Sequence, residues 1–122
     1  MFGAEARAVL RYGNISRYYN MTQDEALAIL RTGAHVFLTG EAGSGKTHTI
    51  NRYTTYLREH GIDFAVTAST GIAATHIHGM TIHAWSGVGV ERQLDDDAIA
   101  DIADNRKVAK RIKKAKVLII DE

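Results

Sequence analysis

One segment of the sequence restricts the possible folds more than any other. Gly40 to Thr47 reads G-E-A-G-S-G-K-T and fits the pattern G-x-x-x-x-G-K-[ST] at every specified position. It follows the β-branched and aromatic run His35 to Thr39, and it leads into Thr47 to His60, where apolar residues recur at helical spacing. A glycine-rich turn between a strand and a helix lets backbone N–H groups point inward, and the helix start adds partial positive charge. The sequence therefore predicts a phosphate-binding loop.

The side chains of this loop suit a nucleotide. Lys46 supplies a point charge for the β- and γ-phosphates, and the Thr47 hydroxyl can ligate Mg²⁺. We expect seven positions to contact the nucleotide: Gly40, Gly43, Ser44, Gly45, Lys46, Thr47 and His48. His48 supports no more specific role. A glycine turn that carries a solvated lysine is the alternative interpretation.

A second signal lies where the sequence ends. Val117 to Ile120 is an apolar run followed by Asp121 and Glu122. Such a run is typical of a buried parallel strand whose carboxyl end delivers acids to the ligand edge of a sheet. We expect Asp121 to hold Mg²⁺ through water, and Glu122 to join Lys46 in catalysis as the general base that polarises the attacking water. A strand that runs into a solvent-facing turn is the alternative.

The remaining pattern predicts a single α/β domain. Residues 1–20 lack a clear period and are interpreted as an N-terminal arm of unknown role, a leader or a partly helical segment. Residues 21–122 begin with a short helix that Thr22 caps, and Phe64 to Ala68 forms a further strand. Together with the strand at His35 to Thr39, it would lie parallel in one sheet, joined by a right-handed crossover. Residues 81–90 are expected to be looped.

Composition excludes several classes of protein. The 122 residues include no cysteine, so disulfides, Cys-based zinc sites and thiol nucleophiles are absent, and a reducing, cytoplasm-like compartment is favoured. No apolar run approaches the length of a membrane-spanning helix. A net charge of +1 does not mark the whole chain as a nucleic-acid binder.

The charges are nevertheless unevenly distributed. Acidic residues gather in 91–104 and basic residues in 106–116, along a stretch with helical spacing over 95–115. We interpret the basic run as a solvated helix face, with a phosphate-facing patch as the alternative.

Two further blocks resemble a known family. T-A-S-T-G-I-A-A, which ends at Ala74, and T-I-H-A-W, which ends at Trp85, resemble motif Ia and its continuation in the PIF-type DNA helicases of superfamily 1, which are related to RecD. The Gly40 to Thr47 loop resembles their motif I, and Asp121 with Glu122 resembles the opening of motif II. The resemblance runs from about Met21 to Glu122. It implies a three-layer P-loop NTPase (RecA-like) fold with a parallel central sheet, of which this chain would be a truncated part.

The resemblance also implies a function. The chain would be the ATP-binding portion of an ATP-dependent 5′-to-3′ DNA helicase, with ATP and Mg²⁺ as cofactors and single-stranded DNA as partner. It would be intracellular, and nucleoid-associated in a bacterium. Without a second RecA-like domain and its arginine, the fragment would hydrolyse ATP slowly or not at all. Another P-loop ATPase, such as an AAA-type remodeller or loader, and a non-catalytic nucleotide-binding module are the alternatives.

Further site residues follow from the resemblance by position. Gln23 resembles the family glutamine that binds adenine, although a capping or exposed glutamine is equally consistent with the sequence. The positions that meet phosphates of single-stranded DNA are Ser69, Thr70 and Gly71, which also form an ordinary helix N-cap. His83 and Trp85 match a region where an aromatic ring can stack on a base, with core packing of Trp85 as the alternative.

Overall fold

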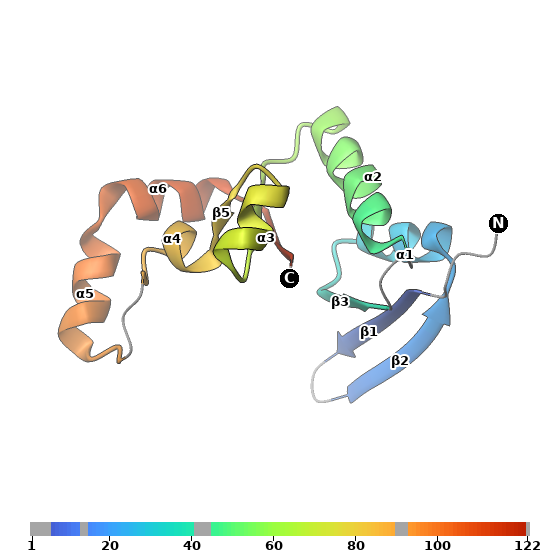
Figure 1. Ribbon diagram of the computed structural model, residues 1–122, viewed down its shortest axis with the longest axis horizontal. Coiled ribbons are helices and arrows are strands. Elements are labelled where there is room, and N and C mark those ends of the chain that lie inside the picture. The colour runs from blue at the N-terminus through green and yellow to red at the C-terminus, as the bar shows by residue number, and fades with distance from the viewer. Residues whose placement is uncertain (1–5, 13–14, 41–44, 90–92, 122) are drawn as a thin grey trace. The chain divides into compact units, whose positions relative to one another are not determined.

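Backbone pairing divides the strands of this chain between two sheets. The computed structural model describes four stretches of the chain, residues 6–12, 15–40, 45–89 and 93–121. They form two compact units, Met1–His60 and Gly61–Glu122. Within the described stretches each unit holds a three-stranded sheet, with strand order β2-β1-β3 in the first and β5-β4-β6 in the second (Figure 1). The chain is therefore α/β, and one of its sheets is small and parallel.

The first sheet is antiparallel. β1 (Ala6–Tyr12) pairs along its length with β2 (Ile15–Met21), and its other edge pairs with β3 (Val36–Thr39). These strands lie in residues that the sequence predicted to be an arm, either a leader or a partly helical segment. The described residues 6–12 and 15–20 are extended, so the prediction of a partly helical segment is wrong for them. Both strands carry β-branched or aromatic residues that favour extended backbone, but neither has the alternating pattern that reveals a strand in a sequence.

The pairing of β3 also differs from the prediction. The sequence predicted β3 and β4 (Phe64–Ala68) as parallel strands of one sheet, whereas β3 pairs antiparallel with β1, and β4 belongs to the other sheet. This prediction is wrong because a strand and its flanking turns specify an extended segment but not its partner. The free edge of β1 pairs with all four residues of β3, with Leu10 opposite Val36.

Two helices complete the first unit. α1 (Gln23–Leu30) begins after Thr22, whose hydroxyl oxygen accepts the Glu25 N–H, so the predicted cap is confirmed. α2 (Lys46–Glu59) follows Gly45 and ends at the predicted place, before a left-handed Gly61. The small apolar core beneath α1 consists of Met21, Ala26, Ile29, Val36 and Leu38.

The second sheet is parallel and centres on β4. β4 pairs with β6 (Val117–Asp121) on one side and with the short β5 (Met80–Thr81) on the other. The hydroxyl of Thr67, fully buried in β4, donates a hydrogen bond of 2.9 Å to the Ile119 carbonyl of β6. The strand predictions for 64–68 and 117–120 are confirmed.

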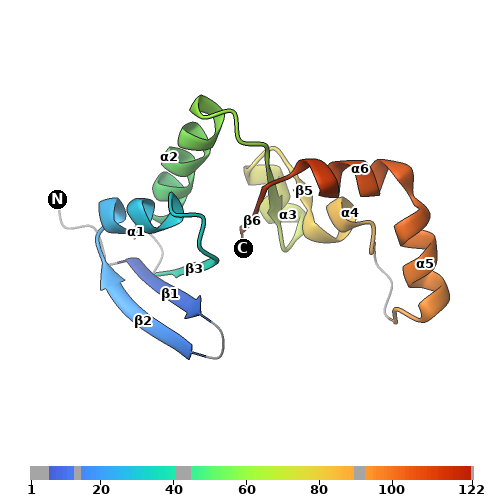
Figure 2. The ribbon, with the colours of Figure 1, turned by 180° about the vertical axis from the view of Figure 1, so that it is seen from behind.

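The described part of the second unit also holds four helices, in chain order α3 (Gly71–His76), α4 (Ile82–Ser86), α5 (Asp96–Asp104) and α6 (Arg106–Lys114). α4 lies in the region expected to be looped, so that expectation is wrong for these residues. The helical stretch predicted over 95–115 is divided at Asn105, whose side chain accepts the N–H groups of Lys107 and Val108 and starts a new helix. α5 and α6 consequently run in different directions (Figures 1 and 2). Among the described helices, none has the length and apolar character needed to cross a membrane.

Candidate functional site

The two flanks of the glycine-rich loop are joined by Lys46. Its Nζ donates a hydrogen bond of 2.6 Å to the carbonyl oxygen of Gly40, the residue that follows β3. The predicted nucleotide contacts Gly43 and Ser44 lie outside the described residues. The ammonium group is therefore held where the chain enters and leaves the loop, at the first residue of α2.

Two features of the structure favour glycine at position 45, before α2. Its φ of +85° lies in the left-handed region, and a Cβ at this position would collide with the side-chain amide nitrogen of Gln23. The carbonyl of Gly45 accepts both the N–H and the hydroxyl of the buried Thr49, at 2.9 and 3.0 Å. The first turn of α2 contains no acidic residue, so the positive end of the helix dipole is not neutralised from within the helix. This geometry suits an anion.

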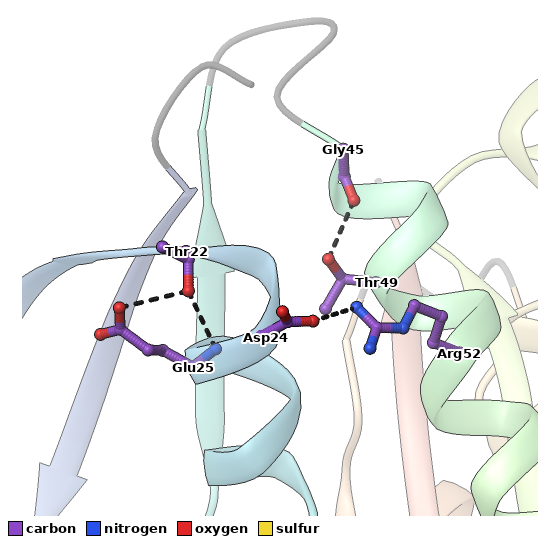
Figure 3. A network of polar contacts seen from close by, with 6 residues as sticks. All are labelled: Thr22, Asp24, Glu25, Gly45, Thr49 and Arg52. Atoms are coloured by element: carbon purple, nitrogen blue, oxygen red, sulfur yellow. Dashed lines mark hydrogen bonds and ion pairs between the residues drawn. The ribbon is translucent and has the colours of Figure 1, made fainter. Parts of the chain in front are cut away.

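Gln23 lies beside Gly45 at the point where α1 packs against α2. Asp24 forms an ion pair of 2.7 Å with Arg52 of α2, as Figure 3 shows. On the opposite side of the same turn, Thr22 caps the helix and donates its hydroxyl hydrogen to the Glu25 carboxylate (Figure 3). The Gln23 amide, half-buried, thus packs against Gly45. In the sequence, the expected adenine contact depended on Gln23 alone. In the structure, this residue lies next to Gly45, at the end of the loop.

Thr47 and His48 lie in the first turn of α2, directly after Lys46. Both side chains are exposed. The described nucleotide candidates of the first unit therefore cluster around one helix start: Gln23, Gly40, Gly45, Lys46, Thr47 and His48.

In the second unit, Asp121 and Ser69 lie at one edge of the parallel sheet. Asp121 is opposite Ala68, the last residue of β4, and its carbonyl accepts the Ser69 N–H at 2.9 Å. Because β4 and β6 are parallel, the acid-bearing end of β6 and the segment that follows β4 emerge at the same carboxyl edge. The predicted general base Glu122 lies outside the described residues.

Thr70 and Gly71 follow at the start of α3. The Thr70 hydroxyl oxygen accepts the Ala73 N–H at 3.2 Å, so the N-cap role that the sequence offered as an alternative is present. Both residues are exposed, while Ser69 is half-buried. A capping hydroxyl retains its own hydrogen, so this role leaves Thr70 able to donate to a ligand.

α4 carries His83 and Trp85. Thr81 caps the helix by accepting the Ala84 N–H at 3.2 Å. His83 is exposed and Trp85 is half-buried, so the indole is neither fully packed in a core nor fully presented to solvent.

Arg111 helps to fix the position of α4, a role that could not be inferred from the basic run in which it lies. The guanidinium of Arg111 donates to two carbonyls of the last turn of α4, from Nε to Trp85 at 2.7 Å and from Nη2 to Ala84 at 2.6 Å. The sequence placed Arg111 in a uniform basic run. Its helical position could have distinguished it, because it lies three residues after the buried Val108 and shares that side of α6.

The chain is similar to a set of helicases. The family model described as PIF1-like helicase matches residues 19–122. The ATP-dependent DNA helicase Pif1 of Psychrobacter sp. (strain PRwf-1) is 51% identical over 102 residues, which cover 84% of this chain and 16% of that protein. The ATP-dependent DNA helicase RRM3 of Saccharomyces cerevisiae is 40% identical over 98 residues, 77% of this chain and 13% of that protein. The ATP-dependent DNA helicase PIF1 of Emericella nidulans is 36% identical over 99 residues, 78% of this chain and 13% of that protein.

The matched segment is a small part of these relatives. The chain spans between 13% and 16% of the length of the three helicases named above. No solved structure matches the chain significantly.

Proposed function

Because the chain belongs to the PIF1-like helicase family, we propose that it is the ATP-binding portion of an ATP-dependent 5′-to-3′ DNA helicase. The full protein would couple ATP hydrolysis to movement along single-stranded DNA. One observation carries the proposal: Lys46, the left-handed Gly45 and the Gln23 amide meet at the first turn of α2, beside a loop with the phosphate-binding pattern. Residues 21–122 would form part of a three-layer RecA-like domain.

The proposed nucleotide site uses the N–H groups at the start of α2 for the phosphates. Lys46 has three N–H donors, and its bond to Gly40 uses one, so two remain for phosphate oxygens. Gln23 would bind adenine, because a side-chain amide offers both a donor and an acceptor to the base.

The residues proposed for metal binding have the right chemistry. Mg²⁺ prefers oxygen ligands, and each unit has one candidate: the exposed Thr47 hydroxyl in the first, and in the second the Asp121 carboxylate, which would bind through water. Bound Mg²⁺ would neutralise charge on the transferred phosphate. Glu122 would accept a proton from the attacking water.

The proposed DNA contacts lie in the second unit. Ser69, Thr70 and Gly71 would meet phosphates, and His83 and Trp85 would meet bases through their rings. A motor that moves along a strand must release each base, so contacts with phosphates and with generic aromatic faces suit it better than base-specific hydrogen bonds.

The nucleotide assignment is tested by Lys46→Ala in the full-length protein. Removal of the ammonium is expected to abolish Mg²⁺-ATP binding in calorimetry, since no other described side chain of the loop carries a positive charge. Unchanged affinity would exclude the loop as the phosphate site. Stimulation of ATP turnover by single-stranded DNA separates a helicase from other P-loop ATPases, and turnover itself separates both from a non-catalytic module.

Thr70→Asp tests the DNA assignment. Aspartate is as good an N-cap as threonine, so α3 is expected to stay folded while the new negative charge repels the phosphate. Affinity for single-stranded DNA, measured by fluorescence anisotropy at fixed salt, should fall at least tenfold with ATP binding near normal. Equal DNA affinity in the variant and the parent would favour the generic ATPase alternative.

A further inference from the structure

α6 presents a stripe of positive charge on one side. With 3.6 residues per turn, five exposed cations fall within an arc of about 120° on the side opposite the buried Val108. We call this set the α6 stripe: Arg106, Lys107, Lys110, Lys113 and Lys114. No acidic residue occurs within α6.

The sixth cation of the helix has a different task. Arg111 donates both of its hydrogen bonds to carbonyls of α4, as described above. The stripe, by contrast, has no carboxylate partner among the described residues. This holds although four exposed aspartates lie on the preceding helix: Asp96, Asp97, Asp101 and Asp104. The five charges are therefore not used to hold the described fold together.

The N-terminal part of the stripe is also unfavourable for α6 itself. Lys110 has like charges three or four residues away in both directions, and such neighbours repel one another on a helix surface. Arg106 and Lys107 occupy the first turn, where the helix dipole favours negative charge. Residues that destabilise the helix they belong to are expected where the surface they form has a function.

We propose that the α6 stripe is a second phosphate-binding surface, which holds the backbone of single-stranded DNA beyond the contact at α4. The inference rests on the proposed function. Lys107 and Lys114 lie four residues before and three after Arg111, so the edge of the stripe borders the residue that touches α4. A nine-residue helix is about 13 Å long, which is enough to face several successive phosphates. The stripe adjoins α4, where the proposed contacts are with bases of single-stranded DNA, so a single strand is favoured over a duplex.

The test compares two double variants of the full-length protein. Lys110→Gln with Lys114→Gln removes two charges from the stripe and keeps good helix formers in place. The matched control, Arg31→Gln with Arg58→Gln, also removes two exposed charges, from the first unit, where the Arg31 guanidinium lies over the Tyr56 ring. The probes are a labelled oligo-dT long enough to extend past the α4 contact and a blunt duplex, and anisotropy is measured over a range of salt concentrations.

The stripe variant is expected to bind oligo-dT about tenfold more weakly near 0.1 M salt. Its plot of log affinity against log salt should be shallower by about 1.4, because each lost single-strand phosphate contact contributes about 0.7. ATP affinity and binding by the control should match the parent. An unchanged slope, an equal loss in the control, or a loss confined to the duplex would each overturn the inference. A parent protein that binds no single-stranded DNA would overturn the proposed function as well.

Discussion

Gly45 shows how much one residue can determine at this site. Its backbone conformation starts α2, and its missing side chain makes room for Gln23. The same position therefore links the loop to α1, which packs against α2 and carries the Asp24–Arg52 ion pair at its exposed side. The phosphate-loop pattern requires Gly45. The same glycine also leaves room for Gln23, a residue that is not part of the pattern.

Gly45→Ala is expected to damage both functions. An alanine in the left-handed region costs about 1 to 2 kcal/mol, and its Cβ would displace the Gln23 amide. Mg²⁺-ATP affinity should fall at least tenfold, measured by calorimetry alongside urea unfolding. Gly33→Ala is the matched control, because Gly33 has nearly the same φ, +82°, with no atom within 4 Å of its added Cβ.

The two variants separate the effect of backbone strain, which both share, from the effect of the contact with Gln23, which only Gly45→Ala has. Both should lose stability from the backbone, but only Gly45→Ala should lose nucleotide affinity. If Gly33→Ala weakened ATP binding equally, general destabilisation would explain the effect, and the contact with Gln23 would carry no functional weight.

At the scale of elements, α4 depends on α6 for its position. α4 has only five residues, too few to be stable alone, and its C-terminal carbonyls are bound by Arg111. The turn after it is also constrained, because a Cβ on Gly87 would come within 3.0 Å of Val108. The short helix that carries the proposed base contacts is thus held by the inner side of α6, while the outer side carries the α6 stripe.

Arg111→Lys should loosen α4 without removing the charge. A single ammonium cannot reproduce the planar two-donor geometry of a guanidinium, so about 1 to 2 kcal/mol of stabilisation is expected to be lost. Trp85 is the only tryptophan of the 122 residues, so its emission reports on α4. We expect a red shift in emission and lower affinity for single-stranded DNA. Lys116→Arg is the control, and identical emission in both variants would show that Arg111 does not position α4.

At the scale of the whole molecule, the described chain holds two units, each with its own sheet. The nucleotide candidates at the start of α2 belong to the first, and the carboxyl edge of β4 and β6 belongs to the second. The family match covers residues of both units, which agrees with the resemblance seen in the motif blocks. The matched relatives are several times longer, so the proposed helicase cycle would involve parts beyond the segment they share.

The isolated 122-residue chain is expected to hydrolyse ATP far below the usual enzyme rate of about 10 per second. In the proposed enzyme an arginine from a second RecA-like domain stabilises the transition state, and such a residue contributes a factor of about 10³ to 10⁵. Phosphate release measured with saturating ATP and oligo-dT checks this, with Lys46→Ala as the background control. Turnover at ordinary rates would mean that the chain needs no second domain.

The sequence by itself determined the parts of this protein that depend on neighbours along the chain. The Thr22 cap, the left-handed Gly61 after α2, and the strands at 64–68 and 117–120 were all predictable, because capping, turn geometry and apolar runs act over a few residues. The motif blocks identified the family for the same reason, since each is a short continuous segment.

Only the tertiary structure decided which distant segments meet. The pairing of β3 with β1, the contact of Gln23 with Gly45 and the bonds from Arg111 to α4 each join residues well separated in the sequence. A strand edge, a side-chain amide and a guanidinium can each form hydrogen bonds with many partners. The residue type alone therefore does not determine which partner is bound. The selection follows from which surfaces the rest of the chain brings within reach.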